Sequence, residues 1–242
     1  MIDPLRFERA KAEALRPVDD GGIGTLGEKT VHAVLKAYYR EADMAAEVKL
    51  GRFVADLWDG QRAIEIQTRS LERLLPKLNA WLPKHPVRVV VPVARHKWLV
   101  RLDPETAAVS GKRRSPITGR PCHALAEIYP LRALLRHPNL SITVVMLDVL
   151  EYRATAPEAR SGARRYDRVP LELVQEINLP GAPWAALLPE GLPRPFTAAH
   201  LRKAGGFPRR GRAAWQALKV LEGLEVINRD GKAGNSILYR EI

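Results

Sequence analysis

Two carboxylates, nine residues apart, are the side chains of this sequence most suited to chemistry. Asp56 lies near the end of one apolar strand-like run, and Glu65 lies inside the next, followed by Ile66 and Gln67. Carboxylate oxygens are hard ligands that favour Mg²⁺ or Mn²⁺. A cation held in this way can act as a Lewis acid on a phosphate, so the pair predicts a site for phosphodiester hydrolysis.

A hairpin would bring the two carboxylates together. Asp59 and Gly60 predict a two-residue type I′ turn, because Asp-Gly supplies the positive φ angles of that turn. Side chains alternate along a strand, so Asp56, Glu65 and Gln67 would then share one face, with the first two in diagonal positions about 7 Å apart. The alternative is an ordinary hairpin with one solvated face. Asp is depleted in strands, which favours the functional interpretation.

The charge of the chain is concentrated in two segments. The 242 residues carry a net charge of +12. Residues 1–83 hold 13 basic and 13 acidic residues, whereas residues 84–120 hold 9 against 2 and residues 194–242 hold 10 against 4. This distribution predicts a polyanionic partner, with DNA favoured and RNA left open.

Several classes of protein are disfavoured by composition. A single cysteine, Cys122, excludes an internal disulfide and a cysteine-rich zinc site. The six histidines show no pair at ligand spacing, which disfavours a zinc enzyme. The N-terminal residues lack the apolar stretch of a signal peptide, and no apolar run approaches a membrane span, so we expect a cytoplasmic protein without membrane contact.

The elements around the carboxylates follow a recognisable order. Apolar periodicity predicts a helix, three strands, a second helix with Pro76 at a kink or in its first turn, and a strand covered on both faces; their ranges are 25–40, 46–50, 52–58, 62–68, 71–82 and 87–93. This order, with Asp56 on the second strand and Glu65-x-Gln67 on the third, resembles the PD-(D/E)XK nuclease superfamily over about residues 24–94.

The resemblance implies an α/β fold with a restriction-endonuclease-like mixed sheet flanked by helices. It implies catalytic roles for Asp56, Glu65 and Gln67, and a Mg²⁺ or Mn²⁺ ion held by Asp56, Glu65 and the Ile66 carbonyl. Glu28 stands where some members add an acid, although a first-turn Glu is also favoured by the helix dipole alone. Glu47 is a second candidate for that acid. Gln67 replaces the more usual Lys, and Gln can orient a water but cannot offset charge on phosphorus.

The middle of the chain predicts further elements of the same domain. Residues 97–103 and 107–113 are predicted to form a second hairpin. Its end carries Lys112, Arg113 and Arg114, which either contact phosphates or belong to a solvated turn, and the first interpretation is favoured. Residues 123–136 indicate a helix, residues 141–149 a strand, and residues 160–168 a basic loop.

The C-terminal residues predict a separate small unit. We divide the chain into an N-terminal extension (1–22), a nuclease-like domain (23–180), a linker (181–195) and a unit at 196–242. That unit has a helix at 198–204, a helix from Pro208, and a hairpin of residues 224–228 and 236–239. It resembles a winged helix-turn-helix domain. Winged helices also bind proteins, but the basic residues of the second helix favour nucleic acid: Arg209, Arg210, Arg212 and Lys219.

Two functions follow from these patterns. The first is a magnesium-dependent DNA nuclease delivered to DNA by its winged helix. The second is a non-catalytic DNA-binding protein or transcriptional regulator with a degenerate nuclease-like core, which Gln67 favours. The sequence does not decide between a monomer and a homodimer.

Overall fold

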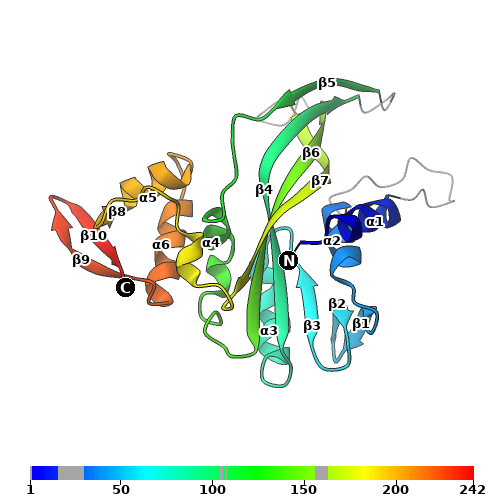
Figure 1. Cartoon of the computed structure of the whole chain (residues 1–242), viewed down its shortest axis with the longest axis horizontal. Helices are drawn as coiled ribbons and strands as arrows, with labels where there is room; N and C mark the ends of the chain where they lie inside the picture. The colour runs from blue at the N-terminus through cyan, green and yellow to red at the C-terminus, as the bar shows by residue number, and fades with distance from the viewer. Residues whose placement is uncertain (1, 16–29, 104–105, 107, 156–162) are drawn as a thin grey trace.

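A large mixed sheet forms the centre of the molecule (Figure 1). The structure is a computed structural model of the chain and describes residues 2–15, 30–103, 106, 108–155 and 163–242. The strand order is β1-β2-β3-β4-β6-β7, with β5 paired to the outer part of β4. β3, β4 and β6 are mutually parallel, and the remaining pairs are antiparallel. The strands are β1 (Ala45–Leu50), β2 (Phe53–Trp58), β3 (Ala63–Ile66), β4 (Val87–Leu102), β5 (Val109–Arg114), β6 (Leu140–Thr155) and β7 (Ala163–Leu179).

Helices cover both faces of this sheet because the central strands are apolar on both sides. On β4, Val89 and Val91 face one core cluster, while Val90 faces the other. The second cluster is covered by α1 (Pro4–Ala14) and α2 (Thr30–Tyr39). The first cluster, which includes Val89 and Val91, is covered by two α-helices and two 3₁₀ helices: α3 (Leu75–Trp81), α4 (His123–Glu127), η1 (Leu71–Leu74) and η2 (Tyr129–Leu131). Helix α1, which the sequence patterns did not predict, buries Phe7 and Ala10 in the core.

The C-terminal residues add two helices and a small sheet. After η3 (Trp184–Leu187), the elements are β8 (Phe196–Thr197), α5 (Ala198–Gly205), α6 (Ala213–Gly223), β9 (Ile227–Ala233) and β10 (Ser236–Glu241), with the strands in the order β8-β10-β9. Helix α6 packs against α4. Leu218 and Leu221 of α6 belong to the same core cluster as Leu125 of α4, so this unit shares its hydrophobic core with the large sheet.

Several predicted elements are confirmed. Pro76 lies in the first turn of α3, as expected for a residue that lacks an N–H. The apolar run at 87–93 is a central strand buried on both faces. Thr197 caps α5 by accepting the His200 N–H at 3.3 Å, and Gly206 ends that helix with φ +68°.

Other predicted elements are wrong in extent. The helix predicted at 123–136 stops at Glu127, because Pro130 cannot donate the hydrogen bond that would continue it. The described part of the predicted 160–168 loop belongs to β7, which pairs with β6 along its length. Residues 97–102 continue β4 and are not a separate strand, but their antiparallel pairing with β5 confirms the predicted hairpin. Helix α6 begins at Ala213, not Pro208, because Gly211 has φ +105°. The C-terminal strands also run further, turning at residues 234–235.

Candidate active site

The turn between β2 and β3 sets the register of the two carboxylates. Trp58 pairs with Ala63, and the Asp59 N–H faces the Arg62 carbonyl at 3.4 Å, so the two loop residues are Gly60 and Gln61. The predicted Asp59-Gly60 turn is therefore wrong by one residue. The Asp59 carboxylate instead accepts the N–H groups of Gln61 and Arg62 at 2.9 and 2.7 Å, which stabilises the later turn.

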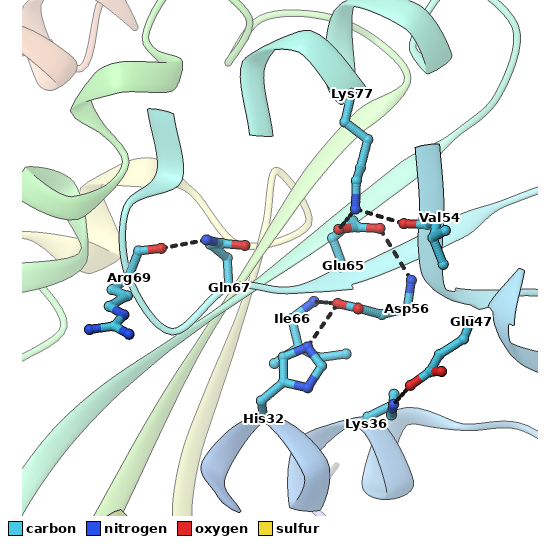
Figure 2. Close-up of polar contacts among 10 residues, drawn as sticks. All are labelled: His32, Lys36, Glu47, Val54, Asp56, Glu65, Ile66, Gln67, Arg69 and Lys77. Carbon is cyan, nitrogen blue, oxygen red and sulfur yellow. Dashed lines mark hydrogen bonds and ion pairs between the residues drawn. The ribbon is translucent and has the colours of Figure 1, made fainter. Parts of the chain in front are cut away.

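This shift brings the predicted acids closer than a diagonal placement would. Continued by one step, the Leu57–Ile64 pairing sets Asp56 directly opposite Glu65, still on one face. Backbone pairing between β2 and β3 ends at Leu57–Ile64. Beyond that pair, the two carboxylates accept the backbone N–H groups of the opposite strand (Figure 2). The Asp56 N–H donates to Glu65 Oε1 at 3.2 Å, and the Ile66 N–H donates to Asp56 Oδ2 at 2.8 Å. Each carboxylate thus satisfies a backbone donor of the opposite strand where the strands separate.

Two cationic or titratable side chains complete this arrangement from the flanking helices. His32 of α2 places Nε2 at 3.2 Å from Asp56 Oδ2. Lys77 of α3 places Nζ at 2.7 Å from Glu65 Oε2 and donates to the Val54 carbonyl, also at 2.7 Å. Figure 2 shows the two acids between these helices. The sequence patterns missed both residues.

Burial and mutual repulsion separate the titration of the two acids. Glu65 is 2% exposed, and burial, followed by the negative charge of Asp56, raises its pKa to about 7 against the opposing effect of Lys77. Burial also acts to raise the pKa of Asp56, but the His32 hydrogen bond and charge, the Ile66 N–H and Lys77 together hold that pKa below its ordinary value. Near neutral pH Asp56 is therefore ionised, whereas Glu65 is partly protonated.

Gln67, the predicted water-orienting residue, points away from the acids. Its backbone N–H donates to the Val90 carbonyl at 2.9 Å, as β3–β4 pairing requires. Its side-chain amide donates to the Arg69 carbonyl (Figure 2). The same amide nitrogen lies 3.5 Å from the Ser70 carbonyl. The amide is thus used by the turn that follows β3.

The two acids open into a pocket of about 230 Å³ with a strongly polar lining. Besides Asp56, Glu65, Ile66 and Gln67, the pocket is lined by His32, Thr68, Arg69, Ser70, Arg73 and Lys77. In the part of the chain that the structure describes, no three His, Cys, Asp or Glu side chains gather as a metal-binding group. Mg²⁺ often binds through only one or two carboxylates, with waters and substrate phosphates completing its shell. The donor set of this pocket fits that mode of binding.

The candidates for an additional acid do not join this pair. Glu28 lies outside the described residues. The Glu47 side chain is 70% exposed and its carboxylate is directed to Lys36 of α2, at 2.7 Å (Figure 2). Its backbone has φ +57°, which is uncommon for a residue other than glycine.

The predicted phosphate contacts lie in two separate places. Lys112, Arg113 and Arg114 are exposed on β5, which extends away from the helices on the outer part of β4 (Figure 1). Arg209, Arg210 and Arg212 are exposed in the segment before α6. Lys219 is set apart from these arginines, because its Nζ is 2.6 Å from Glu222 and its charge is used within the unit.

The sequence carried a partial signal for the residues that were missed. His32 and Lys36 are polar positions four residues apart on α2, which buries its other side, so they mark the helix face that meets the hairpin. Lys77 follows Pro76 in the first turn of α3, and a proline there predicts where the helix begins. Neither pattern indicates which carboxylate each side chain would meet.

Comparison with known proteins identifies a family. Residues 29–180 match the family described as "Domain of unknown function (DUF8091)", so the chain belongs to that family. The chain is also similar to a protein of Treponema pallidum (strain Nichols) described as uncharacterized. The two are 31% identical over 229 residues, which cover 90% of this chain and 87% of the relative. No solved structure matches the chain. Among the described helices, none is long and apolar enough to cross a membrane.

Proposed function

We propose that the protein is a metal-dependent nuclease that hydrolyses phosphodiester bonds in DNA. The observation that carries this proposal is the convergence of Asp56 and Glu65, from two separating strands, in a pocket otherwise rich in cationic side chains. Two acids suit a divalent cation, and the cations beside them suit the phosphate that such a metal would bind. A purely structural carboxylate pair does not require arginines such as Arg69 and Arg73 in the same pocket.

The architecture supports a more specific version of this proposal. We propose that the large sheet and its helices are a PD-(D/E)XK-like core. Helix α2, strands β1 to β3, helix α3 and strand β4 follow in the order that this resemblance requires. We likewise propose that α5, α6 and the β8-β10-β9 sheet form a winged helix-turn-helix unit that contacts DNA. Exposed arginines before α6 support that role.

The metal would be held by Asp56, Glu65 and the Ile66 carbonyl. Mg²⁺ or Mn²⁺, when bound, supplies a Lewis acid for the scissile phosphate and lowers the pKa of a bound water. Asp56 is suited to this task because His32 and the Ile66 N–H stabilise its ionised form. Glu65 becomes an effective ligand only when it loses its proton, which the Lys77 ammonium favours.

Lys77 can perform the task that Gln67 cannot. Its ammonium lies 2.7 Å from Glu65 Oε2, so it stands beside the metal-binding carboxylate even though position 67 lacks a lysine. The flexible four-carbon stem of lysine lets the ammonium leave Glu65 and meet a phosphate oxygen. There it would offset the negative charge that develops during hydrolysis. Lys77 therefore replaces the lysine that the sequence motif lacks.

One observation favours the second candidate function, a non-catalytic nucleic-acid-binding protein. Lys77 already neutralises Glu65, and the Gln67 amide is engaged by backbone carbonyls. A core that had lost its metal could retain this arrangement as a buried ion pair. The basic residues on β5 and before α6 would then account for binding by themselves.

A cleavage assay with matched variants separates these functions. Linear, supercoiled, branched and single-stranded DNA, and RNA of the same sequence, are incubated with the full chain and Mg²⁺ or Mn²⁺. We expect cleavage of at least one DNA substrate, loss of cleavage in Asp56→Asn and Lys77→Met with nucleic-acid affinity retained, and no loss in Glu47→Gln. Cleavage of RNA alone would change the substrate class. If wild type and Gln67→Lys are inert on every substrate, the non-catalytic function replaces the nuclease.

A further inference from the structure

A second, larger cavity lies directly beside the acidic pocket. It has a volume of about 460 Å³ and lies between β4, α4 and the turn that joins α5 to α6. Gln67 and Thr68 line both this cavity and the acidic pocket, so the two are separated only by the residues that follow β3. Phe207 and Pro208 of the C-terminal unit form one of its walls, and residues of the large-sheet unit form the others. We call this cavity, between the two lobes of the chain, the inter-lobe pocket.

The lining of the inter-lobe pocket combines apolar surface with a few polar groups. Val91, Val93 and Ala126 are among its apolar residues, and His123 and Phe207 provide aromatic rings whose centroids are 4.9 Å apart. The Arg120 N–H donates to His123 Nδ1 at 3.2 Å, which places the proton of the neutral ring on Nε2. Nε2 is itself buried, with no hydrogen-bond partner at normal distance among the described residues. Burial lowers the pKa of His123, and the Gly205 backbone beside the ring opposes this lowering. Such a lining and volume suit a flat, mainly apolar group with polar edges.

The mouth of the pocket indicates that this group belongs to an anion. Pro208 and Ala213 both line the cavity, and between them in the chain lie the exposed Arg209, Arg210 and Arg212. Lys97 and Arg168 also line the cavity, as does the acidic Glu127, and Arg168 pairs with the buried Glu151 at 2.9 Å, so the exposed arginines before α6 carry most of the positive charge offered to a ligand. A flat group with polar edges that is attached to phosphates is a nucleotide. Bases of single strands are bound in this way, by stacking on aromatic side chains while cations contact the backbone.

We propose that the inter-lobe pocket binds one unstacked base of a nucleic-acid strand whose neighbouring phosphate lies at Asp56 and Glu65. This inference rests on the proposed function, since it assumes a nucleic-acid substrate. A base can enter the pocket only from a single strand, a strand end or a distorted duplex, because a stacked and paired base is not accessible. The C-terminal unit then has a second role: its α5–α6 turn builds part of the substrate site, beyond contacting DNA.

The experiment fills the pocket and follows one base. A short single strand carrying one 2-aminopurine is bound to full-length Asp56→Asn protein without divalent metal, so that no cleavage occurs. Filling the cavity by Ala126→Phe should weaken single-strand affinity about tenfold, as expected for loss of one stacked base, and leave duplex affinity unchanged. Ala199→Phe adds the same side chain at an exposed position of α5 outside the pocket and should have no effect. Melting temperatures check that the variants are folded.

A second readout does not depend on the filling variant. In the Asp56→Asn complex, 2-aminopurine at the bound position should be protected from acrylamide quenching, and DNA and RNA strands are compared in parallel. A 2-aminopurine that stays accessible at every position of the strand, or a folded Ala126→Phe variant with unchanged affinity, would overturn the proposal. Protection without any metal-dependent cleavage by wild type would keep the base pocket and reject the nuclease. Cleavage without protection would do the reverse.

Discussion

Replacing Lys77 by methionine tests the electrostatics of the candidate site. Methionine retains much of the apolar stem but removes the ammonium, which lies 5.3 Å from the centroid of the Trp81 ring and 2.7 Å from the buried Glu65 carboxylate. Because the pKa of Glu65 is about 7 in the folded chain and about 4.3 when unfolded, the folded state binds more protons between these values. The stability that this site contributes therefore falls as the pH rises from about 4 to about 7. Without Lys77 the folded pKa rises further, and the fall continues above pH 7.

The expected loss of stability depends on pH. At pH 5 Glu65 is protonated in the folded state, so Lys77→Met should cost about 1 kcal/mol, mainly for the lost hydrogen bond to the Val54 carbonyl. At pH 8.5 the variant leaves a buried carboxylate without its cation, which should cost about 3 kcal/mol. Urea unfolding at both pH values and one salt concentration measures the difference. Lys36→Met is the matched control, because Lys36 pairs with the exposed Glu47 and should show no such pH dependence. Equal losses at both pH values for Lys77→Met would refute the reasoning.

Three further predictions concern other parts of the structure. Asp56→Asn removes a charge that raises the pKa of Glu65, so that pKa should fall below 7 in a ¹³C carboxyl NMR titration; an unchanged value would mean that burial acts alone. Arg209→Gln combined with Arg210→Gln should reduce the log–log salt slope of DNA binding by about 1.8, since each phosphate contact contributes about 0.9; an unchanged slope would assign binding to another surface. Phe7→Ala should lower the free energy of unfolding in urea by about 3 kcal/mol, because Phe7 is buried in the core cluster between α1, α2 and the large sheet. A negligible loss would show that α1 is not part of the core.

The elements around the site were predictable because their patterns are local. Strand β4 alternates between two buried faces, so its apolar run has no polar side. Pro76 limits the helix around it to a kink or a first turn, and the structure has the first turn. Helix α1 was not predicted, since only Phe7 and Ala10 of that helix are buried and the apolar stripe is too narrow to stand out. Its position depends on tertiary contacts with α2, which no local pattern records.

The candidate site was only partly predictable for the same reason. The pairing of Asp56 with Glu65 depends on strand parity, which survived the one-residue error in the turn because the register moved by two. The predicted strand at 62–68 ends at Ile66, so Gln67 is the first residue after β3, and the direction of its amide depends on the carbonyl of Arg69 in the following turn. Lys77 reaches Glu65 from a helix 12 residues later in the chain, a contact that exists only once the helix packs on the sheet.

Binding of Mn²⁺ to the full chain, followed by electron paramagnetic resonance with a short phosphorothioate-protected DNA strand present, tests the central claim most directly. The account predicts one bound ion in wild type, loss of that ion in Asp56→Asn and in Glu65→Gln, and retention in Glu47→Gln. Wild type that holds no Mn²⁺, or Asp56→Asn that holds it as tightly as wild type does, would contradict the assignment of these two carboxylates to a metal.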